Sequence, residues 1–168
     1  MKGPVTMAIV VLVATGAPTL IAATTIQARL DGAQETPAVS TTGTGVFRAT
    51  INDAETAIDY EISYENLEGA TTAAAHIHLG QISVAGGVAA FLCGGGGKPA
   101  CPATAGMVTG TIMAADVIGP AGQGIAAGEF AELLQAIRQR ITYVNVHTDK
   151  HPGGEIRGQV RRIREPMP

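Results

Sequence analysis

Apolar and polar residues alternate through most of the chain from residue 25 onward, which is the pattern of half-buried β-strands. The clearest run is AIDYEISYENL, in which Ile58, Tyr60, Ile62 and Tyr64 share one face and mostly acidic side chains occupy the other. Similar runs lie at 25–32, 45–53, 73–80, 86–93, 107–114, 142–148 and 154–163. The turn residues of 52–56 favour a hairpin between the second and third strands. The pattern predicts an all-β fold, an antiparallel Greek-key-like β-sandwich or barrel.

One segment has the period of a helix instead. In GEFAELLQAIRQR the apolar residues Phe130, Leu133, Leu134 and Ile137 recur at the spacing of one helix face. Acidic residues precede them and arginines follow, as the helix dipole prefers. We expect one short helix near residues 128–140, laid against a sheet or across the end of the barrel or sandwich.

The first 23 residues have the pattern of a secretory signal peptide: a lysine, an apolar run and small residues at its end. The alternative is a membrane anchor, but Gly16 and Pro18 interrupt the run. The predicted organisation is a signal peptide at 1–23, a β domain at 24–160 and a short basic, proline-containing tail at 161–168. We therefore expect a secreted, periplasmic or cell-surface protein whose mature chain has no transmembrane span.

The charge of the chain argues against nucleic-acid binding. The formal net charge is −3, and the one basic cluster is RRIR at 161–164. Neutralising a phosphate backbone requires clustered lysines and arginines. We interpret the cluster as a solvated terminus.

Two cysteines, Cys93 and Cys101, bracket the sequence GGGGKPA. In an exported protein two nearby thiols usually pair, and the glycines allow the loop to curl, so we predict a disulfide. A soft metal site is the alternative, although two thiolates alone make a poor one. The GGGGK stretch is not a phosphate loop, because Pro99 stands where serine or threonine should follow the lysine.

Three stretches, LDGAQETPAVSTTGTGVF, YENLEGATTAAAHIHLG and ITYVNVHTDKHPGGEIRGQV, resemble the CHRD domain, named after chordin and also found in small exported bacterial proteins. The resemblance covers about residues 28–160. It departs from the family pattern at Ala38, Thr142 and His151, so it implies no role for His151. The resemblance implies an all-β extracellular or periplasmic domain, without a defined biochemical function.

All four histidines lie in the two most specific of these stretches. On a strand His76 and His78 share a face, and if the two strands are adjacent His147 joins them. Imidazoles suit copper or zinc, so we predict a metal site of His76, His78 and His147, with His151 as an optional fourth ligand. The arrangement is similar to the strand His-x-His of copper-zinc superoxide dismutase. The alternative is that the histidines are polar struts that hydrogen-bond the turn or Glu155.

The turn PGGEIRGQV is interpreted as structural. Pro152 fixes one turn angle, and Gly153 and Gly154 supply positive φ for a tight hairpin. Arg157 can donate to carbonyls or a carboxylate, and Glu155 with Arg157 could form an ion-paired cluster.

Two functions follow from these residues. The first is a non-catalytic extracellular or periplasmic binding or structural module, with or without a histidine metal site, that contacts an unknown extracellular or envelope partner. The second is a copper or zinc protein with superoxide-type redox or metal-capture activity. We identify no catalytic residues, because no Ser-His-Asp or Cys-His arrangement is visible.

Overall fold

The computed structural model describes residues 23–163, and its main element is one antiparallel sheet. The strands are β1 (Thr24–Asp31), β2 (Thr44–Ile51), β3 (Ile58–Glu65), β4 (Thr72–Leu79), β5 (Val88–Cys93), β6 (Gly106–Ile112), β7 (Thr142–Thr148), β8 (Ile156–Gln159) and β9 (Arg161–Arg162). Their order in the sheet is β5-β4-β7-β8-β1-β2-β3-β6, and β9 pairs with β1. Each predicted run forms a strand, and β2 and β3 form the predicted hairpin.

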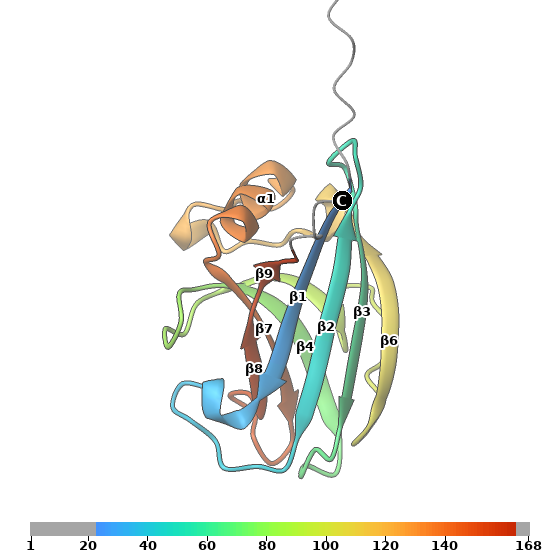
Figure 1. Ribbon diagram of the computed structural model, residues 1–168, viewed down its shortest axis with the longest axis vertical. Coiled ribbons are helices and arrows are strands. Elements are labelled where there is room, and N and C mark those ends of the chain that lie inside the picture. The colour runs from blue at the N-terminus through green and yellow to red at the C-terminus, as the bar shows by residue number, and fades with distance from the viewer. Residues whose placement is uncertain (1–22, 164–168) are drawn as a thin grey trace, which may run out of the picture.

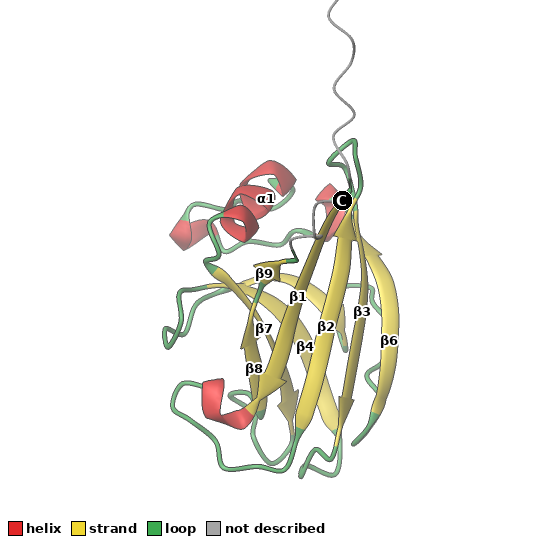
Figure 2. Cartoon of the chain, viewed as in Figure 1, coloured by secondary structure: helices red, strands yellow, loops and turns green. Residues whose placement is uncertain are grey.

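The sheet curls into a nearly closed barrel, so the predicted all-β class is confirmed (Figures 1 and 2). The two end strands of the sheet are β5 and β6, and the Tyr60 hydroxyl of β3, the neighbour of β6, donates to the Leu92 carbonyl of β5 at 2.7 Å. The predicted disulfide between Cys93 and Cys101 is confirmed, and it ties the end of β5 to the segment that leads into β6. Side chains and a covalent bond therefore join the two edges where the strand ladder stops.

The core fills the barrel interior with the inward residues of the alternating strands. Phe47, Ile62, Ile77 and Val144 are fully buried, as are most residues at equivalent positions. Burying a side chain of this size stabilises a fold by about 1.5–3 kcal/mol. The period-two pattern in the sequence therefore reports directly which residues enter the barrel.

The predicted helix is α1 (Phe130–Arg138), and it covers one end of the barrel (Figure 2). Its apolar stripe is buried, including Leu133 and Leu134. Glu132 lies in its first turn and Arg138 in its last, as expected from the dipole. Three 3-10 turns, η1 (Gly32–Gln34), η2 (Ala114–Asp116) and η3 (Ala121–Gln123), complete the secondary structure.

The outer face of β4, β7 and β8 differs from the rest of the barrel exterior. Polar side chains point outward there, yet His76, His78, Asn145, Arg157 and Gln159 are all buried. Side chains and backbone of residues 35–36, 80–86 and 151–154 contact them from outside. This covered polar patch is where the histidines lie.

No helix in residues 23–163 is long and apolar enough to cross a membrane. The predicted signal peptide and most of the predicted tail lie outside the described residues.

Candidate metal centre on the outer face of the barrel

Two adjacent strands, β4 and β7, carry the three predicted metal ligands. His76 and His78 are two residues apart on β4, so both side chains leave the same face of the sheet. The antiparallel register sets His76 opposite Asn145 and His78 opposite Tyr143. His147 follows Asn145 by two residues and therefore points to the same face. The strand parity inferred from the sequence is what brings the three imidazoles together.

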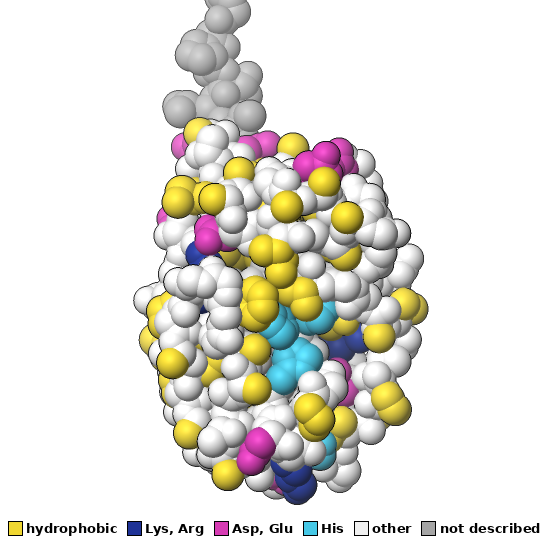
Figure 3. Space-filling model, turned by 180° about the vertical axis from the view of Figure 1, so that it is seen from behind, with side chains coloured by type: hydrophobic (Ala, Val, Ile, Leu, Met, Phe, Trp, Pro, Cys, Tyr) yellow, Lys and Arg dark blue, Asp and Glu magenta, His cyan; other side chains and the backbone are white. Residues whose placement is uncertain are grey.

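The three imidazoles form a compact cluster, with one nitrogen of each within 4.8 Å of those of the other two. Ring centroids are 4.9 Å apart for His76 and His147, 5.3 Å for His76 and His78, and 6.1 Å for His78 and His147. Figure 3 shows histidine side chains gathered near the middle of this face, bordered by hydrophobic ones. Two nitrogens that bind one tetrahedral ion at about 2.0–2.1 Å are about 3.4 Å apart. A shared ion thus requires the longest nitrogen–nitrogen separation to shorten by up to about 1.4 Å.

Backbone carbonyls fix the proton position on two of these rings. Nδ1 of His78 lies 2.9 Å from the Gly86 carbonyl oxygen, and Nδ1 of His147 lies 2.9 Å from the Pro152 carbonyl oxygen. A carbonyl only accepts, so each Nδ1 carries the hydrogen and each neutral ring has its lone pair at Nε2. Histidines that bind metals are commonly oriented in this way, with the second nitrogen donating to a carbonyl or carboxylate.

The two Nε2 atoms have no matching donor. Nε2 of His78 is buried and has no hydrogen-bond partner within residues 23–163. Nε2 of His147 faces Oδ1 of Asn145 at 3.0 Å, which sets an oxygen acceptor against a nitrogen lone pair. A proton or a metal ion between these atoms would remove the conflict, as would a 180° rotation of the Asn145 amide that turned its nitrogen toward His147.

Burial keeps the imidazoles neutral. His76 and His78 are 8% and 7% exposed. Loss of solvation, followed by the proximity of His147 and His78, lowers the pKa of His76 to about 3. Burial lowers the pKa of His78 to about 4, although its bond to the Gly86 carbonyl opposes the shift. Burial also lowers the pKa of His147. Neutral imidazole is the form that binds metal ions.

A stack of planar groups supports His78 from one side. The Tyr143 ring lies parallel to the His78 ring, with 4.8 Å between centroids and 8° between planes. The Arg157 guanidinium carbon lies 3.4 Å from the Tyr143 ring centroid. Arg157 in turn donates to the carbonyls of Gln81 and Val84 at 2.9 and 3.0 Å. The loop after β4 is thereby tied to β8 through a buried cation.

Glu35, in the loop after η1, reaches the edge of the cluster. Its Oε1 is buried without a hydrogen-bond partner in the described chain. Burial raises the pKa of Glu35 to about 7, although the nearby Arg157 charge lowers it. The Cα of Gly154 lies beside both Glu35 Oε1 and the Asn145 amide nitrogen, since an added Cβ would come within 2.4 and 2.8 Å of them.

His151, the predicted optional fourth ligand, is not part of the cluster formed by His76, His78 and His147. Its carbonyl accepts from the backbone nitrogens of Thr148 and Gly154 and thereby closes the turn after β7. Its Nε2 is buried without a partner in the described residues.

Glu155 and Arg157 do not form the suggested ion pair, because their side chains lie in separate hydrogen-bond networks. Glu155 is fully buried and accepts from the hydroxyls of Thr41 and Thr148 at 2.6 and 2.7 Å and from the Glu68 backbone at 2.7 Å. Burial by itself would raise the pKa of Glu155, but these hydrogen bonds lower it. The carboxylate ties three loops together at one end of the barrel.

The turn at Pro152 also differs in detail from the prediction. Of its two glycines, Gly154 has a positive φ of 126°, whereas Gly153 does not adopt one. Only Gly154 therefore has the positive φ that was predicted for both glycines.

Sequence analysis missed Glu35, Asn145, Tyr143 and Phe91 as parts of this centre. Asn145 and Tyr143 could have been found, since they share the strand parity of His147. Glu35 and Phe91 reach the histidines through tertiary contacts that no local pattern reports.

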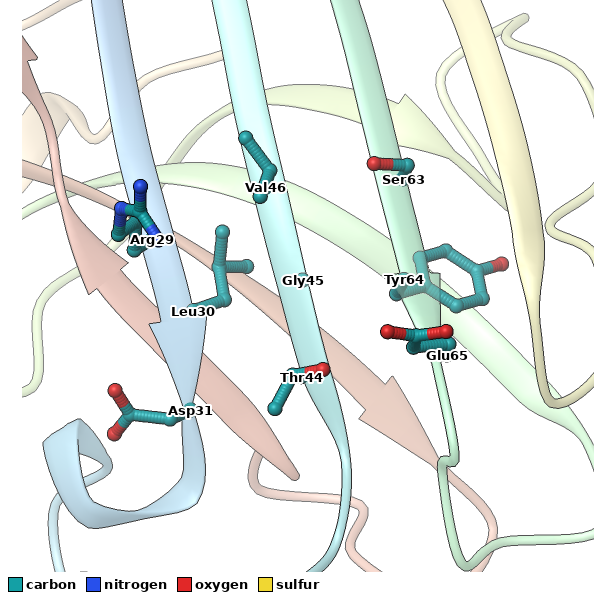
Figure 4. A pocket seen from close by; sticks show the side chains of 9 residues that line it. All are labelled: Arg29, Leu30, Asp31, Thr44, Gly45, Val46, Ser63, Tyr64 and Glu65. Carbon is teal, nitrogen blue, oxygen red and sulfur yellow. The ribbon is translucent and has the colours of Figure 1, made fainter.

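A hollow of about 620 Å³ lies elsewhere, over β1, β2 and β3 (Figure 4). Arg29, Asp31 and Glu65 are among its lining residues, so its charges are mixed. It contains none of the histidines, and its shallow, solvated lining offers no converging donor set.

A family model described as the CHRD domain matches residues 26–160, most of the chain. The match agrees with the resemblance seen in the sequence and includes both histidine-bearing strands. No curated protein and no solved structure matches the chain.

Proposed function

This chain belongs to the CHRD domain family, and on that basis we propose that it is an exported binding module that captures a copper or zinc ion through His76, His78 and His147. Family membership supports a binding or structural module. The leader-like first 23 residues and the disulfide are compatible with an extracellular or periplasmic location.

The observation that carries the proposal is the convergence and orientation of the imidazoles. His78 and His147 donate Nδ1–H to backbone carbonyls, which leaves the lone pair of each neutral ring at Nε2. Nε2 of His78 has no partner within residues 23–163, and Nε2 of His147 contacts the side-chain amide of Asn145. His151 also has a buried Nε2 without a partner in the described residues, so what distinguishes the proposed ligands is that one nitrogen of each of three rings lies within 4.8 Å of those of the other two.

The chemistry of the donors favours copper or zinc over magnesium or calcium. The cluster consists of three neutral nitrogens, whereas magnesium and calcium prefer carboxylate and carbonyl oxygens. Three protein ligands leave a fourth position of a tetrahedral ion for water or an external ligand. When bound, such an ion would act as a Lewis acid, while the protein contributes the fixed tautomers and the dry surroundings.

The test is elemental analysis of the mature protein purified without a histidine tag, followed by calorimetric titration with zinc and with copper. We expect about one ion per chain. His78→Ala should weaken binding by at least about 100-fold, because a ligand is lost and losing even an outer partner typically costs 10–100-fold.

His151→Ala is the matched control, because it removes a histidine of the same stretch that lies outside the cluster. It should change affinity much less than His78→Ala does. Equal affinity of the wild type and His78→Ala would contradict the proposal. The histidines would then be polar struts, leaving the family's binding or structural role.

A further inference from the structure

A groove separate from the three histidines follows the outer side of β1, β8 and β9. It consists of two adjoining hollows of about 220 and 230 Å³, both lined by Gln34, Gln159 and Arg161. Arg29 lines the first hollow, and Arg157 and Ile82 line the second. We call this the arginine groove. Its combined size falls within the range of about 300–1,000 Å³ found for small-ligand sites.

The groove is positively charged on a chain whose formal net charge is −3. Its lining contains three arginines and no aspartate, glutamate or lysine. Within residues 23–163, none of Arg29, Arg157 and Arg161 has a carboxylate within ion-pair distance. Arg157 is buried and is compensated by the carbonyls of Gln81 and Val84, the Tyr143 ring and the nearby Glu35. The unpaired positive charge that the groove offers to an anionic ligand is therefore that of the exposed Arg29 and Arg161.

The two glutamines are fixed as acceptors. Both amide hydrogens of Gln159 are committed, to the carbonyls of Gly80 and Arg140 at 2.9 and 3.0 Å. Those of Gln34 are committed to the Arg29 carbonyl and the Asp31 carboxylate at 2.9 and 2.8 Å. No donor of the described chain bonds to Oε1 of either glutamine, so both oxygens remain free for a ligand's hydroxyl groups.

The rim adds an apolar contact, because Ile82 is 65% exposed. A suitable ligand therefore needs acidic groups for the arginines, hydroxyl donors for the glutamine oxygens and an apolar C–H face. We propose that the arginine groove binds an acidic saccharide. A single-stranded nucleic acid fits less well, because the lining offers no aromatic ring for base stacking.

The experiment is a calorimetric titration of the full mature protein with an oligogalacturonate, at low and at moderate salt. Parallel titrations use a sulfated dextran, a neutral malto-oligosaccharide, inorganic phosphate and a single-stranded DNA oligonucleotide. We expect the oligogalacturonate or the sulfated dextran to bind, with the better of the two identifying a carboxylate or a sulfate as the acidic group. Affinity should fall as salt rises.

The double variant Arg29→Gln and Arg161→Gln should weaken that binding at least tenfold. The double variant removes two positive charges from the groove, and Arg138→Gln is the control that removes one positive charge from α1, outside the groove. Gln34→Met should weaken saccharide binding more than any phosphate binding, because it removes a hydroxyl acceptor along with the amide hydrogen bonds to Arg29 and Asp31 and leaves the arginine charges in place.

Unchanged binding in the double arginine variant would overturn the proposal. So would DNA binding as tightly as the saccharides with the same arginine dependence, since this result would mean simple charge attraction. Zinc or copper capture by His76, His78 and His147 is measured separately, so the two proposals can fail independently.

Discussion

The ring of Phe91 on β5 lies edge-on against the imidazole of His76 on β4, with 4.4 Å between centroids and 78° between planes. The two residues are directly paired across the strands. On its other side Phe91 is covered by the loop that the disulfide closes. A Cβ at Gly95 or Gly96 would lie 2.4 or 2.9 Å from the Phe91 ring, so only glycine allows the backbone to approach this closely.

The disulfide should therefore influence the metal centre through Phe91. We predict that Cys93→Ala with Cys101→Ala weakens zinc affinity by about tenfold, the lower end of what losing a supporting contact costs. The reason is that the loop is no longer held against the ring that fixes His76. Calorimetry without thiol reductant measures the effect, since added dithiols would themselves bind zinc.

Phe91→Ala completes a double-mutant cycle for this prediction. If the disulfide acts on the metal centre through the phenyl ring, the variant that combines Phe91→Ala with both cysteine changes should bind zinc no more weakly than whichever of its two parent variants binds zinc more weakly. Gly122→Ala is a control in η3, where no atom lies within 4 Å of the added Cβ. Full zinc affinity in a folded protein without the disulfide would contradict the coupling.

The same disulfide should contribute to stability apart from any metal. Its closed loop is short, with a sequence separation of 8. We expect the cysteine double variant to lose roughly 2–3 kcal/mol of unfolding free energy. Urea denaturation of the metal-free protein measures this loss, and an unchanged midpoint would show that the surrounding hydrogen bonds suffice.

Metal affinity should resist mild acid. An exposed histidine protonates near pH 6.5, but burial lowers the pKa of His76 to about 3 and of His78 to about 4. Zinc affinity should therefore change little between pH 7 and about 5 and fall steeply only near pH 4. A loss centred at pH 6.5 in a zinc titration series would mean that the imidazoles are solvated.

As the pH is lowered, the free energy of unfolding of the metal-free protein should begin to fall at a higher pH than the zinc affinity does. Unfolded histidines bind protons below about pH 6.5, whereas folded His76 and His78 do so only near pH 3 and 4. Since the unfolded state binds more protons in this interval, the free energy of unfolding falls as the pH drops through it. Chemical denaturation between pH 7 and pH 4 measures the slope.

The strands, the helix and the disulfide could be predicted because each depends on a local pattern. Alternation at Ile58, Tyr60 and Ile62 reflects a single buried face, and the helical spacing from Phe130 to Ile137 reflects a single apolar stripe. The shared face of His76 and His78 was also predictable from strand parity, but their convergence with His147 depends on the pairing of β4 with β7, which the sequence left as a condition.

The surroundings of the cluster were not predictable from local patterns. Alternation suggested that the polar faces of β4, β7 and β8 are solvated, yet loops bury them. Glu35 approaches Asn145 and Arg157 across more than a hundred residues, and such contacts follow from the barrel closing and not from any periodicity. Gly153 and Gly154 look equivalent in the sequence, but Glu35 crowds only Gly154.

Glu35 provides a pH test in the alkaline direction, because its pKa is raised, whereas the pKa values of His76 and His78 are lowered. Burial raises the pKa of its carboxyl from 4.5 to about 7. A group with a raised folded-state pKa favours folding below its unfolded pKa, and this contribution disappears as the pH rises through the folded value. Glu35→Gln should therefore gain stability relative to the wild type above pH 7, by up to about 3 kcal/mol, and little or none at pH 4. Denaturation curves at pH 4 and pH 8.5 would reveal the crossover, and an equal effect at both pH values would contradict it.

The two adjacent glycines of the turn after His151 provide a matched pair for a final prediction. Gly154→Ala should lose about 2–3 kcal/mol of unfolding free energy, because φ is 126° there and the new Cβ would meet Glu35 Oε1 at 2.4 Å. Gly153→Ala should stay within about 0.5 kcal/mol, because no atom lies within 4 Å of its added Cβ. Thermal and urea denaturation of both metal-free variants measure the difference.

Because the displaced Glu35 and Asn145 lie at the edge of the histidine cluster, Gly154→Ala should also weaken zinc binding, while Gly153→Ala should not. Equal stability of the two variants would mean that the turn relaxes freely and that Gly154 does not position the edge of the metal centre.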